Sequence, residues 1–221
     1  MNLNFALILI ILVMISGVAI GLDKGWFAKR RDVAQARPKW IEWSYAFFPI
    51  FVIVLLIRSF AGELFRIPSG SLEPTLQVGD MVLVNKFQYG LKWPVVNRKF
   101  ISVSEPQPGD IAVFLWPADP SLYYVKRVVG VPGDHIEYQN KQFKINGQPV
   151  EQTYVGEVSV FDGFGQLRQV QQWDETLNGT TYSVYRRPEV IAHDFELTVP
   201  PDHYFMIGDN RDDSMDSRHW G

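Results

Sequence analysis

The sequence predicts a mainly β protein, in which two N-terminal transmembrane helices precede an extracytoplasmic antiparallel β domain of coiled sheets. Three observations predict it: two long apolar segments near the N-terminus, a basic segment between them, and a series of short alternating strands after them. The chain has 221 residues, of which 47% are hydrophobic and 14% aromatic, so it is not a disordered chain.

The first apolar segment, residues 5–22, is 18 residues long and carries no charge, which is about the length that crosses a bilayer. A cleaved secretory signal peptide is the alternative interpretation. It is disfavoured because the start of the chain is uncharged and no clear small-residue cleavage site follows. We therefore predict a retained first span over residues 1–22.

The second apolar segment, residues 45–61, has one charge, Arg58, close enough to the end to reach the lipid headgroups. Pro49 is tolerated in a membrane helix. A buried core helix is the alternative, but residues 47–57 show no amphipathic period. We predict a second span over residues 44–62.

The charges fix an expected orientation. Residues 23–43 hold six basic and three acidic side chains, and basic loops stay in the cytoplasm. The N-terminus and residues 63–221 are therefore predicted to lie outside, which in a Gram-negative cell is the periplasm. Residues 1–62 carry a charge of +4 and residues 63–221 a charge of −7. The acidic body argues against nucleic-acid binding.

Residues 63–221 show no sustained helical period but many short runs separated by turn signals. Asn146-Gly147 is typical of a two-residue hairpin turn. The segment around 139–192 is rich in Gln, Gly and Thr and is predicted to be a less tightly patterned insertion. The expected strands cover residues 81–87, 110–116, 123–131, 135–138, 142–145, 148–150, 181–186, 195–199 and 204–207.

The chain has no cysteine, which excludes a disulfide scaffold, a thiolate zinc site, an iron–sulfur cluster and a cysteine nucleophile. The four histidines show neither the spacing of a zinc protease motif nor a nucleophile elbow. We therefore expect no metal and no cofactor.

Two segments could carry nucleophilic chemistry. In residues 67–76, prolines and a glycine hold Ser69 and Ser71 in a rigid loop; an ordinary linker is the alternative. In residues 123–130, a strand would place Lys126 between Tyr124 and Val128 on one face. Burial there would lower the pKa of Lys126 and make it a usable base, although a lysine at a sheet edge is the alternative.

A third segment, residues 208–221, holds four aspartates and two arginines. A solvated acidic loop or a calcium loop is the alternative interpretation. The calcium loop is disfavoured because the spacing lacks the glycine and terminal glutamate of an EF-hand.

Together these segments resemble the bacterial type I signal peptidases, the serine–lysine leader peptidases. The resemblance lies in Ser-Gly-Ser at 69–71, Tyr-Val-Lys-Arg at 124–127 with Gly-Val-Pro-Gly-Asp at 130–134, and Gly-Asp-Asn-Arg at 208–211 with its downstream Ser, Asp, Arg and Trp-Gly. It covers essentially the whole chain and is weakest over 139–192. Leu72 stands where family members usually have methionine, a near-isosteric change. Members also continue beyond the position of Gly221, so a natural short form or a fragment is expected.

The resemblance implies a Ser/Lys dyad. It makes Ser71 the nucleophile, Lys126 the general base and Ser69 an oxyanion-hole donor. Ser214 is implied to orient Lys126, with Asp216 and Arg218 as a supporting ion pair. The implied pockets for small substrate side chains involve Ile67, Pro68, Leu72, Leu76, Tyr124 and Val125.

The resemblance also implies the activity and its setting. We expect a membrane-bound endopeptidase that removes signal peptides from exported preproteins after a small-x-small site. Its expected partners are these signal peptides and the bilayer, and it would act as a monomer beside the export machinery in the inner membrane. A specialised Ser/Lys protease of a pilus or conjugation system and an inactive membrane-anchored binding module remain as alternatives.

Overall fold

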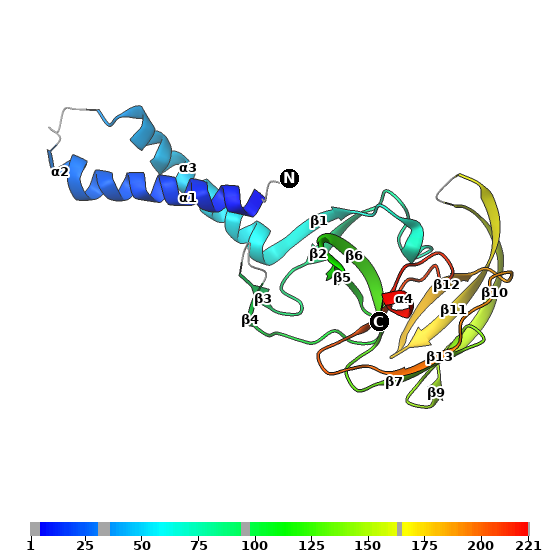
Figure 1. Ribbon diagram of the computed structural model, residues 1–221. Helices are drawn as coiled ribbons and strands as arrows, with labels where there is room; N and C mark the ends of the chain where they lie inside the picture. The colour runs from blue at the N-terminus through cyan, green and yellow to red at the C-terminus, as the bar shows by residue number, and fades with distance from the viewer. Residues whose placement is uncertain (1–4, 31–35, 94–97, 163–164, 221) are drawn as a thin grey trace. The chain divides into compact units, whose positions relative to one another are not determined.

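The computed structural model describes residues 5–30, 36–93, 98–162 and 165–220, with the side chain of Lys92 left out. The chain divides into two compact units, residues 1–64 with 83–105 and residues 65–82 with 106–221. Figure 1 shows the path of the chain through both.

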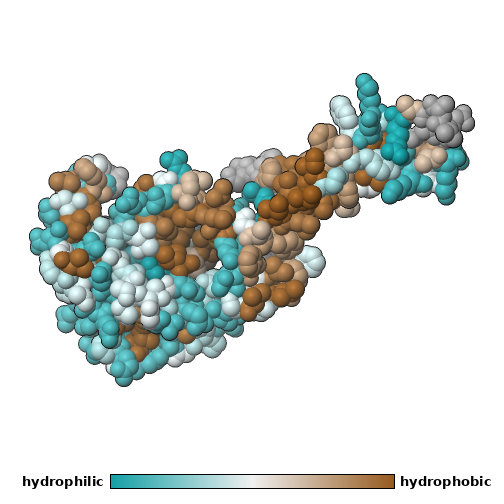
Figure 2. Space-filling view, turned by 180° about the vertical axis from the view of Figure 1, so that it is seen from behind, coloured by the Kyte–Doolittle hydropathy of each residue, from teal (hydrophilic) through white to brown (hydrophobic). Residues whose placement is uncertain are grey.

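The first unit is built on two long helices. Helix α1 (Phe5–Leu22) continues through the π-helical turn η1 (Asp23–Phe27) into α2 (Ala28–Arg30), and α3 (Lys39–Leu56) continues into η2 (Ile57–Ala61). The helical stretches Phe5–Arg30 and Lys39–Ala61 are long and apolar enough to cross a membrane. They bury little of their apolar surface against protein, and Figure 2 shows apolar side chains over the helical part of this unit. Such an exposed apolar surface suits a lipid solvent.

Short strands follow the second helix. Strand β1 (Gly62–Arg66) pairs with β2 (Met81–Asn85), and β3 (Leu91–Lys92) pairs with β4 (Lys99–Ile101). In the first unit Trp93 and Phe100 pack with ring centroids 4.6 Å apart, and Phe60 lies 6.4 Å from Phe100. Trp93 is 55% exposed, so this aromatic group is not a core.

The second unit contains a three-stranded antiparallel sheet in the order β14-β6-β5. Its strands are β5 (Ile111–Trp116), β6 (Asp119–Gly130) and β14 (Phe205–Ile207). The long central strand β6 is exposed at its start and fully buried from Lys126 to Gly130. Its C-terminal half therefore lies inside the domain, with β14 on one side and β5 on the other.

Two further antiparallel sheets complete the unit, in the orders β13-β7-β8-β9 and β10-β11-β12. Asn146 and Gly147 form the tight turn between β8 and β9, both with positive φ, as the Asn-Gly pair predicts. The short helical elements are η3 (Gly70–Leu72) and α4 (Ser217–Trp220). The remaining strands are β7 (His135–Gln139), β8 (Gln142–Ile145), β9 (Gln148–Pro149), β10 (Glu151–Phe161), β11 (Leu167–Leu177), β12 (Thr180–Arg186) and β13 (Phe195–Thr198).

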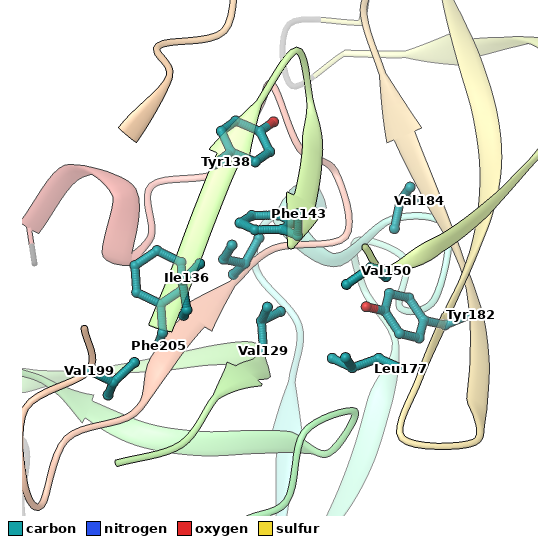
Figure 3. Close-up of a cluster of buried hydrophobic side chains, with 11 residues drawn as sticks. Val129, Ile136, Tyr138, Phe143, Val150, Leu177, Tyr182, Val184, Val199 and Phe205 are labelled. Carbon is teal, nitrogen blue, oxygen red and sulfur yellow. The ribbon is translucent and has the colours of Figure 1, made fainter. Parts of the chain in front are cut away.

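One apolar core joins these sheets. Figure 3 shows Val129 from β6 together with Val150, Leu177 and Tyr182 from the region of β9 to β12. Tyr138 and Phe143, from the hairpin of β7 and β8, stack within it at 4.4 Å between ring centroids. Because these residues come from three sheets, burial of their apolar surface fixes the sheets against each other.

Residues 151–177 are more regular than their composition predicts. Strands β10 and β11, each 11 residues long, form a hairpin that the sequence did not indicate. No apolar alternation shows in β11 because one face carries Gln169 and Gln171 and because Glu175 occupies a fully buried position between Trp173 and Leu177. A charged residue at a core-facing position defeats a pattern search that is based on hydrophobicity.

Candidate active site

The segment that carries Ser71 is held by backbone bonds on both sides. Ile67 donates its N–H to the carbonyl of Asp80 at 2.9 Å, and the Ile67 carbonyl accepts the N–H of Gly79 at 2.8 Å. Ser71 lies in the 3₁₀ turn η3, and its carbonyl accepts the N–H of Asn210 at 3.1 Å. The Asn210 side-chain amide donates to the carbonyl of Gly70 at 3.1 Å. The turn is therefore fixed to the chain segment that follows β14.

Lys126 reaches Ser71 from the middle of the neighbouring sheet. Its Nζ lies 2.5 Å from the Ser71 Oγ, although the two residues are 55 positions apart in the sequence. The lysine is only 4% exposed. A charged ammonium would donate to the hydroxyl, whereas a neutral amine would accept the hydroxyl proton.

Burial is the main cause of the altered pKa of Lys126. Removal from water lowers the pKa of Lys126 from its usual range to about 8. Asp216 and Asp209 act in the opposite direction and raise this pKa, whereas Arg218 lowers it further. A lysine with this pKa is neutral in a useful fraction of molecules near neutral pH, as a general base requires.

Aromatic rings lie beside the lysine. Tyr124, two residues earlier on the same face of β6, has its ring centroid 5.7 Å from the Lys126 Nζ. Trp116 stacks on Tyr124 at 5.2 Å, and Trp220 of α4 meets Tyr124 edge-on at 5.5 Å. These rings supply part of the apolar surroundings that disfavour a charged amine.

Asp216 and Arg218 form an ion pair, and the charges of both residues act on Lys126. The guanidinium Nε lies 2.8 Å from the carboxylate Oδ1, and a second guanidinium nitrogen donates to Oδ2 at 2.8 Å. Burial alone would raise the pKa of Asp216, but Arg218 and the Gly208 N–H outweigh it and hold this pKa below its usual range. The pair therefore presents an ionised carboxylate on the Lys126 side of the fold.

Ser214 is buried and close to this carboxylate, and it contributes to the lowered pKa of Asp216. No contact of its Oγ meets hydrogen-bond geometry among the described residues, although it lies close enough to Asp216 to lower that pKa. A Cβ at Gly208 would collide with Ser214 and with the Ser71 carbonyl, so only glycine fits there. The orienting role of Ser214 stays a prediction.

The other implied residues differ in how much of their surface is accessible. Ser69, two residues before Ser71, is exposed and has an extended backbone. Of the implied pocket residues, Ile67 and Leu72 are buried, Pro68 is exposed, and Leu76, Tyr124 and Val125 are half-buried. Ile67 and Leu72 therefore present little surface to a ligand. Among the described residues no three His, Asp or Glu side chains gather in a way that could hold a metal ion.

One structural group of the site was missed from the sequence. Arg127, the neighbour of Lys126, binds Asp209 through two nitrogens at 2.8 and 2.7 Å, and both side chains are nearly inaccessible to solvent. Thr75 donates its hydroxyl to the same carboxylate at 2.5 Å. This group connects the Ser71 segment, strand β6 and the segment after β14. The sequence signal that could have revealed this group is the charged Arg127, directly after Lys126 in a buried part of the strand.

Comparison with known proteins identifies the family. The family model described as "Signal peptidase, peptidase S26" matches residues 40–221. The chain belongs to this signal peptidase family. Signal peptidase I of Pseudomonas fluorescens is 42% identical, and the match covers the whole chain and 84% of that protein. Signal peptidase I of Pseudomonas aeruginosa is 40% identical with the same coverage.

The family membership agrees with the predicted fold class and with a membrane-anchored serine protease. It does not favour the alternatives of a specialised pilus protease or an inactive binding module. A solved signal peptidase I from Enterococcus faecalis is 27% identical over 54% of this chain and 90% of that chain, with a TM-score of 0.35. The family assignment rests on the sequence matches.

Proposed function

We propose that this signal peptidase cuts signal peptides from exported preproteins with a dyad of Ser71 as nucleophile and Lys126 as general base. The observation that supports the dyad most strongly is the 2.5 Å separation of the Lys126 Nζ and the Ser71 Oγ, with the lysine buried. A nucleophile within hydrogen-bond reach of a base with a matched pKa is the arrangement that acyl transfer needs.

The proposed acylation step begins when the neutral Nζ of Lys126 takes the proton of the Ser71 hydroxyl. The Oγ then forms a bond to the scissile carbonyl carbon, and the carbonyl π bond breaks to give an oxyanion. Collapse of this intermediate breaks the C–N bond, and the leaving amine receives the proton from Nζ. The mature protein departs and the signal peptide remains as an ester on Ser71.

In deacylation Lys126 takes a proton from water, whose oxygen attacks the ester carbonyl. The bond to the Ser71 Oγ breaks, the oxygen regains its proton, and the signal peptide leaves with a new carboxylate. In both steps we assign oxyanion stabilisation to the Ser69 hydroxyl and the Ser71 N–H. One such donor contributes about 3–4 kcal/mol to lowering the barrier in other serine proteases.

We assign Ser214, Asp216 and Arg218 to supporting this dyad. The ionised Asp216 raises the pKa of Lys126 through its charge. Arg218 fixes the Asp216 carboxylate through two nitrogens. Substrate contact is assigned to Pro68, Leu76, Tyr124 and Val125, and the buried Ile67 and Leu72 are assigned to supporting these residues from beneath.

The proposed setting is the inner membrane of a bacterium. Residues 1–22 and 44–62 would span the bilayer, residues 23–43 would form a cytoplasmic loop, and residues 63–221 would form the periplasmic catalytic domain. The basic residues between the helices support this orientation. The enzyme would act as a monomer beside the export machinery, where the cleavage sites of its substrates leave the membrane.

A cleavage assay tests the proposed function. The detergent-solubilised full chain should cut a preprotein once, after a small-x-small site, and mass spectrometry of the product identifies the new N-terminus. Replacing the residue before the cut by Trp in the preprotein should abolish cleavage, because a pocket for a small side chain cannot hold it. A cut at an unrelated site, or equal cleavage of the Trp preprotein, would contradict the proposal.

The pH dependence of cleavage is a second expected result. Because the pKa of Lys126 lies at about 8 and only the neutral amine is a base, log kcat/KM should rise with pH with a slope of one below this value. Above about pH 8 it should level off. Initial rates at low substrate concentration between pH 6 and pH 9.5 measure this rise, the acid limb of the profile.

A matched control for this profile is Lys144→Met, which removes a lysine that is 42% exposed and remote from Ser71 in the sequence. This variant should keep the wild-type profile. A wild-type profile that is flat across this range would rule out Lys126 as the base.

A further inference from the structure

The fully buried carboxylate of Glu175 is not part of the dyad. It binds Arg211, in the chain segment whose Asn210 fixes the Ser71 turn. Glu175 of β11 is 0% exposed. Arg211 donates to it through both terminal guanidinium nitrogens, one of them to Oε1 at 2.6 Å. Arg186 donates to Oε1 at 2.7 Å, and the Tyr182 hydroxyl donates to Oε2 at 3.2 Å. A buried carboxylate with this many partners is fully compensated, and it is costly to disturb.

The charge of Glu175 is maintained in the folded state. Burial alone would raise the pKa of Glu175, but Arg211 and Arg186 outweigh it and keep the pKa below its usual range. Gln152 of β10 adds a further amide donor at 3.0 Å. The carboxylate is therefore a fixed anion on the central strand of the β10-β11-β12 sheet, which contributes none of the proposed dyad residues.

The segment bound by Glu175 contacts Ser71 directly. Tyr185 of β12 donates its N–H to the Asp209 carbonyl at 2.9 Å and accepts the Arg211 N–H at 2.9 Å. Between these two positions, Asn210 donates its N–H to the Ser71 carbonyl. Residues 209–211 thus lie between β12 and the Ser71 turn, and the side chain of Arg211 ties them to Glu175.

The same segment supports the Lys126 side of the dyad. The Arg211 carbonyl accepts a guanidinium N–H of Arg218 at 2.5 Å. Arg218 in turn holds Asp216, the carboxylate with the largest charge effect on Lys126. A shift of Arg211 would therefore move the Ser71 turn and the Arg218–Asp216 pair together.

We propose that Glu175 is a positioning residue for the dyad, which fixes residues 209–211 and through them both the Ser71 turn and the Arg218–Asp216 pair. The inference rests on the proposed Ser71–Lys126 mechanism. It assigns the β10-β11-β12 sheet a role in cleavage, although that sheet supplies neither nucleophile nor base.

The test compares Glu175→Gln with the matched control Asp174→Asn in the detergent-solubilised full chain. Asp174 is the preceding residue of β11, on the opposite face, where it accepts the Ser183 hydroxyl at 2.6 Å. For Glu175→Gln we expect kcat to fall about 10- to 100-fold, because small misplacement of reacting groups has effects of that size. KM should stay within about threefold, since the pocket residues are untouched.

The acid limb of the kcat profile separates positioning from a loss of folded enzyme. If Asp216 moves away from Lys126, the charged lysine loses its main favourable interaction, so the limb should move to lower pH in Glu175→Gln. Asp174→Asn should keep the wild-type kcat and limb. A kcat decrease in Glu175→Gln that only matches its lost folded fraction, with an unmoved limb, would overturn the proposal.

Glu175→Asp keeps the charge but is one methylene shorter, so it should recover part of kcat and the wild-type limb. If Glu175→Gln does not fold, this variant decides: a reduced kcat at wild-type folded fraction supports positioning, and a wild-type kcat overturns it. Ser71→Ala and Lys126→Ala are assayed in parallel. Activity in either of them would refute the dyad itself, independently of the outcome for Glu175.

Discussion

Ser71→Ala and Lys126→Ala should each lower kcat by about 10⁴-fold or more, as loss of one member of a nucleophile–base pair does in other serine proteases. The effect is large because the two groups act as a unit: the 2.5 Å contact lets Nζ take the proton that Oγ must lose to form the new bond. Single-turnover cleavage of a preprotein, read by product mass, measures it. The double variant should be no worse than either single one, because each change already disables the pair.

Stability measurements provide the control for this result. Ser71→Ala should unfold like the wild type, and Lys126→Met should be at least as stable, since it removes a buried amine that burial disfavours in its charged form. Both variants would therefore be folded and inactive. An inactive Lys126→Met that is also strongly destabilised would indicate a structural rather than a catalytic lysine.

Arg127→Met should destabilise the catalytic domain by about 3–5 kcal/mol, because it leaves the Asp209 carboxylate buried and without its main partner. The Thr75 hydroxyl alone cannot replace two guanidinium donors. The variant also loses the contact of Arg127 with the Tyr182 ring, 3.8 Å from its centroid. Unfolding of the solubilised chain in urea should show a midpoint lowered by more than about 1 M.

The matched comparison is an exposed pair in the same domain. Lys144 lies 3.4 Å from Glu137, and these side chains are 42% and 21% exposed. Lys144→Met should therefore change stability by less than about 1 kcal/mol. The double variant Arg127→Met with Asp209→Leu should recover part of the loss, because no unpaired charge remains. Equal effects of the buried and the exposed substitutions would refute the assigned importance of the Arg127–Asp209 pair.

Much of the architecture could be predicted because it depends on local patterns. Uninterrupted apolar segments of bilayer length indicate spanning helices wherever the rest of the chain lies. Alternating strands and the Asn146-Gly147 turn likewise depend on neighbouring residues, and β8 was predicted with its observed bounds. The hairpin of β10 and β11 was not, because Glu175 replaces an apolar residue at a core-facing position and its partners lie elsewhere in the chain.

For the site, the sequence by itself determined which residue types stand in which motifs, and the resemblance assigned roles to Ser71 and Lys126. Only the tertiary structure decided their 2.5 Å separation, the burial that lowers the pKa of Lys126 to about 8, and the position of Ser214 beside the Asp216 carboxylate. It also decided that Arg127 meets Asp209 and that Arg211 meets Glu175. The physical reason is that desolvation and ion pairing depend on which distant segments pack together, and no local pattern contains that information.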